Sequence, residues 1–429
     1  METSLRRDAL LGRNAFRLNR LEKGYRIPDL AWVSCFFSLL MLCLITRIGA
    51  PAAALFILPW GLLVARNPKR AAFAIIENGP LFLIPAFAFI SFAWSDYPTF
   101  TLNASIQFIL TTVIAIWAGS LVTPRTFISA LLTALTIVNI AGLILDGGAS
   151  FRDEGPLLGV FDSKNQLAFH ALMQLLLALI VVIDHAQAIL MRLVALAAIA
   201  VASVCLIEAQ STGAVVFGAP AIVLCLVLPG FSRLPLLGRA TIVAAVVVVV
   251  VSTVIAIGAF VEDSGAVLDA LGKDSTLTGR SYLWQRAHDF INEAPLLGVG
   301  YQAFWRIGNP PAEELWAFAL VESGAGFNFH NLYLHVAVDL GYIGMGLIIL
   351  TFLWMAIRLC YALILAPSLP VFYAAALFSY MFTISFIEVA ILSQFSLAEI
   401  LFCIIWVYSG VQRPYKSALH PAKRTAMPQ

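Results

Sequence analysis

The stretch FNFHNLYLHVAVDLGYIG, residues 327–344, joins side chains that exchange protons to a run that is apolar enough to enter a bilayer. His330 and Asn331 stand at the start of this run. An imidazole titrates near neutral pH, so a histidine at a membrane surface is suited to take a proton from an attacking hydroxyl group. His330 is therefore a candidate catalytic base. The alternative is an interfacial histidine with no chemical role.

Three polar residues of this stretch fall on one face of the predicted helix. Asn331, His335 and Asp339 are spaced by four, which places them one above another along that face. A charged side chain facing lipid would cost at least ~2.5–3.5 kcal/mol, so the face should point into the protein. We expect His335 and Asp339 to hydrogen-bond as a structural pair. Asn331, at the helix mouth, is a candidate substrate-binding residue.

Arg280 marks the start of a second predicted helix, in TGRSYLWQRAHDFINEAPLLGVGYQAFW (278–305). Apolar residues recur there at three- and four-residue spacing and form one stripe. The stripe consists of Leu283, Trp284, Ala287, Phe290 and Ile291. We expect this helix to lie on the membrane surface or to pack on the ends of the spans. A cation at a helix start is favourable only if an anion binds, so Arg280 is either an anion ligand or the ion-pair partner of Asp274 or a phospholipid.

Lys164 occupies a similar position in GVFDSKNQLAFHALM, residues 159–173. Asp162 or Ser163 is expected to cap the helix, which leaves Lys164 in the first turn, with Asn165 beside it. Lys164 and Asn165 are candidate ligands of a diphosphate or a glycan. The alternative for Lys164 is an interfacial lysine that extends its ammonium group toward water.

The composition requires that these residues be positioned by membrane helices. The chain has 429 residues, of which 61% are hydrophobic and only 12% charged. Soluble domains carry about 25% charged residues, and repeated apolar runs here approach the ~20 residues that cross a bilayer. The net charge of +2 gives no reason to expect a nucleic-acid partner. The fold class is therefore predicted as all-α, a polytopic membrane protein.

About twelve spans are expected from the apolar runs. They are 30–46, 50–65, 79–94, 100–121, 126–145, 165–183, 188–207, 212–229, 239–260, 331–357, 370–390 and 393–411. With the N-terminus inside, 19 of the 26 Lys and Arg residues lie on the inner side. This asymmetry predicts that both termini are cytoplasmic.

The predicted organisation is a single membrane domain with one large outer insertion. It divides into a basic cytoplasmic N-terminus (1–29), spans one to nine (30–260), an outer loop containing short helices (261–330), spans ten to twelve (331–411) and a cytoplasmic tail (412–429). All six cysteines fall in apolar runs, and the chain contains no Asp-x-Asp motif. We therefore expect neither a metal site nor another cofactor.

Several of these stretches together resemble the O-antigen polymerase and ligase superfamily of bacterial envelope glycan assembly. The motifs, in chain order, are SFAWSDYPTFTL (91–102), GVFDSKNQLA (159–168), AQSTGAVV (209–216), TGRSYLW followed by PLLGVGYQAF in the outer loop, and HNLYLHVAVDLGYIG. Each motif is weak alone, but their order and topology make the resemblance specific. The chain looks most like the exopolysaccharide-production branch of polymerases.

The resemblance implies a substrate and roles for particular residues. The substrate would be a glycan carried on undecaprenyl diphosphate at the outer face of the inner membrane. His330 matches the family histidine that activates the acceptor hydroxyl, and Arg280 matches a loop arginine that handles the diphosphate. Many family members carry an arginine soon after the serine that corresponds to Ser211, but this chain reads Ser-Thr-Gly. Lys164, Arg152 and Arg286 are candidates to supply the missing charge.

The expected function is polymerisation of an exopolysaccharide or O-antigen at the periplasmic face of the inner membrane, by a metal-independent glycosyltransferase. One alternative is a ligase that moves finished glycan to lipid A core. Another is a polysaccharide or lipid transporter, which would be expected to carry ionisable residues near mid-span and internal repeats. Besides the lipid-linked oligosaccharide and the bilayer, possible partners are chain-length regulator and export proteins of the same pathway.

Overall fold

The computed structural model describes residues 30–146, 155–248, 276–324 and 326–410, and every regular element in these ranges is a helix. The elements are α2 (Leu30–Cys43), α3 (Ile45–Ile48), α4 (Ala50–Arg66), α5 (Pro68–Glu77), η1 (Gly79–Phe82), α6 (Leu83–Ile90), η2 (Ser91–Ala93), α7 (Pro98–Ser120), α8 (Pro124–Leu145), α10 (Lys164–Ile183), α11 (Ile189–Glu208), α12 (Thr212–Phe231), α15 (Thr276–Glu293), α16 (Pro310–Phe318), α17 (Leu332–Leu365), α18 (Leu369–Ile384) and α19 (Leu397–Ser409). The all-α prediction is confirmed for these residues.

The apolar helices confirm a membrane protein, although they do not settle the number of spans. Six described helices are long and apolar enough to cross a bilayer, or seven if the bent pair α4 and α5 forms one span. Five further apolar helices are shorter: Leu30–Cys43, Gly79–Ala93, Leu236–Val248, Leu369–Ile384 and Leu397–Ser409. About twelve spans remains a prediction, and the second half of the span expected at 239–260 lies outside the described residues.

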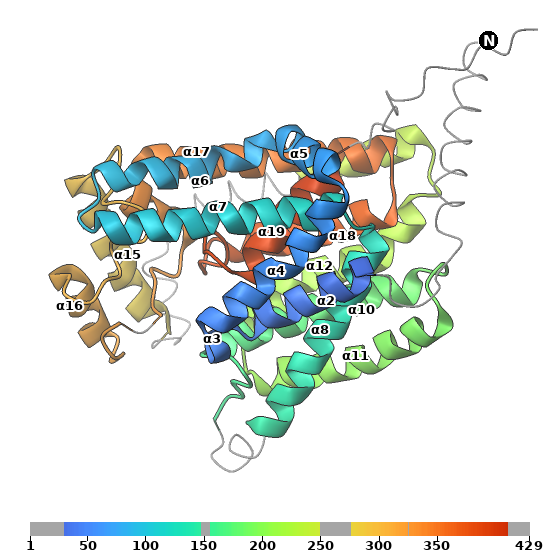
Figure 1. Ribbon diagram of the computed structural model, residues 1–429, viewed down its shortest axis with the longest axis horizontal. Helices are drawn as coiled ribbons and strands as arrows, with labels where there is room; N and C mark the ends of the chain where they lie inside the picture. The colour runs from blue at the N-terminus through green and yellow to red at the C-terminus, as the bar shows by residue number, and fades with distance from the viewer. Residues whose placement is uncertain (1–29, 147–154, 249–275, 325, 411–429) are drawn as a thin grey trace, which may run out of the picture.

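The helices form a bundle with the outer-loop helices at one end. Figure 1 shows α6, α7 and α17 running alongside one another, with α15 and α16 at the end where α17 begins. On the other side of the bundle α10 packs against α8, α11 and α12. A buried polar bridge links three of these helices, because Asn139 donates to Gln174, which in turn donates to the carbonyl of Ala198.

The stripe predicted in the outer loop is buried against the end of the bundle. Leu283, Ala287, Phe290 and Ile291 of α15 are almost fully enclosed in a second apolar cluster that also contains Phe329. Because α15 contacts α17, the loop helix is fixed to a span rather than lying free on the membrane surface. Of the two placements expected from the sequence, packing on a span end is the one observed.

The helix α17 is broken at Gly341, where the sequence predicts one continuous span. Gly341 has φ +66° and ψ −172°, and a Cβ there would overlap the backbone of Leu296. The residues after the break donate backbone hydrogen bonds to the outer loop, from Tyr342 to Pro295 and from Ile343 to Leu296. Backbone groups freed by the break are thus paired inside the protein, as a membrane environment requires.

The segment between α18 and α19 also differs from the prediction. Spans were expected at 370–390 and 393–411, but α18 ends at Ile384 and α19 begins at Leu397. Residues 385–396 are non-helical, and Leu392 and Phe395 have positive φ. Their backbone is held by other elements: Phe395 donates to Thr111 of α7, and Leu392 donates to Glu399 of α19. The two predicted span boundaries are therefore wrong, and the extra length forms a connecting segment.

Candidate active site

Glu388, in the segment between α18 and α19, gathers three residues that lie far apart in the sequence. Its Oε2 is 3.0 Å from Nδ1 of His330. Its Oε1 accepts hydrogen bonds from Nη2 of Arg280 at 3.0 Å and from Nδ2 of Asn165 at 3.0 Å. The carboxylate is 19% exposed, and its arginine and histidine partners are 25% and 23% exposed. The cluster is sheltered but open to a substrate.

His330 is held by its backbone as well as by its ring. It adopts φ +49°, in the left-handed region that residues other than glycine seldom enter. Its amide N–H donates to Oδ1 of Asn328 at 2.7 Å, and the ring of Phe327 lies edge-on to the imidazole. Strained backbone of this kind persists where the surroundings fix it, and it is frequent at active sites.

The contact with Glu388 determines which nitrogen of His330 is available for chemistry. An ionised carboxylate can only accept hydrogen bonds, so Nδ1 of the imidazole must donate its proton to Glu388. The neutral ring then carries its lone pair on Nε2, which can accept a proton. A carboxylate on the far nitrogen also stabilises the imidazolium that forms. His330 and Glu388 together have the arrangement of a general base and its orienting group.

Arg280 lies one turn inside α15, rather than at the very edge where the sequence placed it. Its ion pair with Glu388 uses one of the five N–H groups of the guanidinium. The remaining groups have no partner among the described residues and can point at an anion while the carboxylate holds the side chain in place. Asp274, the alternative partner suggested by the sequence, lies outside the described residues.

Both polar atoms of the Asn165 side-chain amide are hydrogen-bonded. Its nitrogen donates to Glu388, and its oxygen accepts from Oγ of Ser211 at 3.1 Å. Ser211 precedes α12, and Ser163 caps α10 by accepting from the backbone of Gln166. The sequence-predicted residues Asn165 and Ser211 therefore reach the cluster, one directly and one through the other.

Lys164 is the first residue of α10 and immediately precedes Asn165. Its side chain is exposed, and in the described part of the chain it has no hydrogen-bond or ion-pair partner. Lys164 is therefore next in the chain to a residue of the cluster, with an exposed ammonium group.

Asn331 serves the helix rather than the cluster. Its Oδ1 caps α17 by accepting from the backbone of Tyr333 and Leu334, and its Nδ2 donates to the carbonyl of Phe386. Both ends of the amide are thus used within the protein. Asn331 fixes the start of α17 next to His330 and ties it to the segment that carries Glu388.

The predicted pair of His335 and Asp339 is looser than a hydrogen bond. Nε2 of His335 lies 3.8 Å from Oδ2 of Asp339, beyond hydrogen-bond range. That oxygen accepts instead from the backbone N–H of Gln302 at 2.8 Å. The two side chains therefore lie together as the structural pair that the sequence predicts, but at ion-pair rather than hydrogen-bond distance, because the outer loop competes for the carboxylate.

Arg286, another candidate cation, is not part of the cluster. Arg286 pairs with Asp289 at 2.9 Å and with Glu314 at 3.5 Å, and its guanidinium also stacks over Phe290. Arg286 therefore braces α15 against α16. Arg152 lies outside the described residues. Within the described ranges no group of three or more His, Cys, Asp or Glu side chains could hold a metal ion.

A second polar network holds the Glu388 segment against the outer loop. Tyr301 donates to the carbonyl of Leu392 at 2.8 Å, and the amides of Gln302 and Gln394 bond to each other in both directions. Burial raises the pKa of Tyr301 well above its ordinary value, so its hydroxyl remains a donor. This network joins residues 301–302 to residues 392–394 and so limits the movement of Glu388.

Sequence reasoning missed Glu388. It lies in the last turn of the span predicted at 370–390, within FIEVAIL, and no nearby motif marks it. A signal was nevertheless present, because an ionisable residue within an apolar run is a functional candidate by default.

Comparisons with known proteins bear on the family that this chain resembles. Residues 196–349 match the family described as O-antigen ligase, a range that includes Ser211, Arg280 and His330. The chain is also 36% identical over 280 residues to "Exopolysaccharide production protein ExoQ" of Rhizobium meliloti. That match covers 63% of this chain and 62% of the relative, so the chain spans about three-fifths of the relative's length. The resemblance to the O-antigen polymerase and ligase superfamily, including its exopolysaccharide-production members, is thereby confirmed.

Proposed function

We propose that this protein is a glycosyltransferase that polymerises an exopolysaccharide or O-antigen. Its donor is a glycan on undecaprenyl diphosphate, and its acceptor is the sugar hydroxyl of another lipid-linked repeat unit. The observation that carries the proposal is the shared contact of His330 and Arg280 with Glu388. It places a proton acceptor next to a cation, and both are needed for transfer of a sugar from a diphosphate.

The reaction follows from the properties of the two side chains. Nε2 of His330 takes the proton of the acceptor hydroxyl as its oxygen bonds to the anomeric carbon of the donor. The bond from that carbon to the diphosphate oxygen breaks, and its electron pair leaves with the lipid diphosphate. General base catalysis contributes roughly 10²–10⁴-fold to such a step.

The cations act on the leaving group. Negative charge grows on the diphosphate as the bond breaks, and the free N–H groups of Arg280 and the ammonium of Lys164 can stabilise it. Fixed donors of this kind each contribute about 2–4 kcal/mol in a site that excludes water. Because the diphosphate is already an activated leaving group, the proposed chemistry requires no further cofactor.

The bilayer is part of the proposal. The cluster lies where α10, α12 and α17 begin, so donor and acceptor lipids would meet at the outer membrane surface. We place this surface at the periplasmic face of the inner membrane, with both termini in the cytoplasm, in agreement with the distribution of Lys and Arg.

A ligase is the second candidate, because the matching family is described as O-antigen ligase. The two activities share the donor and the chemistry of transfer and differ in the acceptor. Purified protein should be incubated with synthetic undecaprenyl-diphosphate repeat unit alone. A ladder of products supports the polymerase. Reaction only after lipid A core is added supports the ligase. If no product forms with either acceptor, both proposed functions are contradicted.

A further inference from the structure

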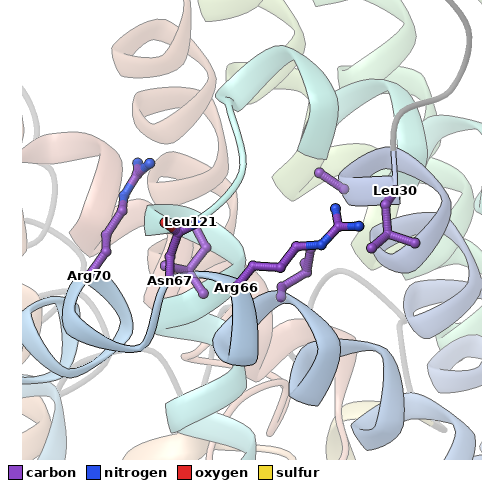
Figure 2. A pocket seen from close by; sticks show the side chains of 7 residues that line it. Leu30, Arg66, Asn67, Arg70 and Leu121 are labelled. Carbon is purple, nitrogen blue, oxygen red and sulfur yellow. The ribbon is translucent and has the colours of Figure 1, made fainter.

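A cavity lies at the end of the bundle opposite Glu388. It has a volume of about 160 Å³, and Leu30, Leu63, Arg66, Asn67, Arg70 and Leu121 are among its lining residues (Figure 2). Near the start of α7, Thr101 bonds to the outer-loop residue Tyr301, whereas Leu121 follows the end of α7. A helix of this length extends about 35 Å, so the cavity is remote from the proposed reaction.

Two arginines give the cavity a positive charge, and none of the described residues that line it is a carboxylate. Arg66 ends α4 and Arg70 lies in the first turn of α5, on either side of a 110° bend at Asn67. Arg70 donates one bond to the carbonyl of Ser120 at 2.6 Å, and within the described ranges Arg66 has no hydrogen-bond or ion-pair partner. In Figure 2 Asn67 and Leu121 lie between the two arginines, and the side chain of Arg66 extends toward Leu30.

The helix α5 shows where this cavity stands relative to the bilayer. Ala71 and Ala74 of α5 are buried against the bundle, whereas Phe73 and Ile76 are 51% and 77% exposed. Lys69 and Arg70 supply positive charge in the first turn of the same short helix. A helix with an exposed apolar side and adjacent basic residues is typical of the membrane interface. The cavity therefore opens at the depth of lipid head groups, with leucine side chains beside it.

We infer that this cavity binds a phosphate group, carried either by an anionic phospholipid or by a soluble phosphate compound. Guanidinium groups present planar pairs of donors that match phosphate oxygens. The volume is about ten times the ~15 Å³ that one water needs, so a phosphate group fits. The leucines of the lining can contact the first carbons of an acyl chain. This inference does not rest on the proposed glycosyl transfer.

The test measures ligand retention by the purified full-length protein, using native mass spectrometry. The probes are phosphatidylglycerol, phosphatidylcholine and inorganic phosphate. The double variant Arg66→Gln/Arg70→Gln should bind its phosphate ligand about tenfold more weakly. The matched control is Arg233→Gln/Arg239→Gln, which removes the same charge from two residues that do not line the cavity and should retain wild-type binding.

The probes distinguish the two sources of phosphate. Preferential retention of phosphatidylglycerol, lost only in the arginine variant, identifies a lipid site. Binding of inorganic phosphate that is equally sensitive to the arginines identifies a site for a soluble ligand. Equal retention by both double variants, or no binding of either anion, overturns the inference. Arg66→Gln alone is a control for misfolding, since it removes no bond made among the described residues, and it should still weaken binding.

Discussion

Nδ1 of His330 lies 3.0 Å from Oε2 of Glu388, although 58 positions separate the two residues in the chain. Glu388 also binds Arg280, so one carboxylate sets the position of a base and a cation together. Neither partner can move far without disturbing the other. The proposed mechanism therefore depends on Glu388 as a positioning residue.

Replacing His330 with Ala should abolish glycan product and leave the protein in the membrane. The reason is the loss of the only imidazole bonded to Glu388 among the described residues. Product is measured as polymer length on a gel, and membrane level by immunoblot. His185→Ala, an exposed histidine that follows the end of α10, is the matched control and should give normal product. Normal polymer lengths from His330→Ala would contradict the proposed catalytic role of His330.

Replacing Glu388 with Gln should lower kcat by roughly 10²-fold or more, because an amide can donate to Nδ1 and so favour the wrong tautomer. The double variant with His330→Ala should lose less activity than the two single losses combined, since the two residues act largely as a unit. Glu314→Gln, on the same side of the protein, is the control. Additive losses in the double variant would contradict coupling between the two residues.

Replacing Arg280 with Gln should reduce turnover more than replacing Arg286 with Gln. Arg280 contacts the cluster, whereas Arg286 braces α15 through Asp289 and Glu314. We expect a loss of about 2–4 kcal/mol in kcat/KM for Arg280→Gln, and partial recovery with Lys. Kinetics with the lipid-linked donor give this comparison. Equal losses for the two variants would show that the effect comes from the loop fold and not from the site.

Replacing Gly341 with Ala should destabilise the protein by at least about 1–3 kcal/mol, the typical cost of a strained backbone conformation. A Cβ at this position also overlaps the backbone of Leu296. The midpoint of thermal unfolding in detergent measures the effect. Gly346→Ala is the control, since it lies in the regular part of α17 with open space around it. A Gly341→Ala protein as stable as this control would mean that the outer loop does not depend on the break.

Much of the fold could be predicted from local patterns in the sequence. The stripe on α15 was visible because three- and four-residue spacing is a property of the helix itself. The same holds for the cap of α10, which the sequence places at Asp162 or Ser163 and the structure at Ser163. In contrast, the break at Gly341 and the non-helical segment 385–396 were missed. Their backbone groups are paired by distant elements, and no local pattern records those partners.

The sequence alone determined that this protein is an all-helical membrane protein, because the length and apolarity of its runs decide how the backbone satisfies its hydrogen bonds in lipid. It also identified His330, Arg280 and Asn165 as polar residues at helix starts. Only the tertiary structure decided that these three converge on Glu388 and that Arg286 does not. The physical reason is that side-chain partners are set by the packing of α10, α15 and α17 around the segment between α18 and α19, over separations that sequence spacing does not encode.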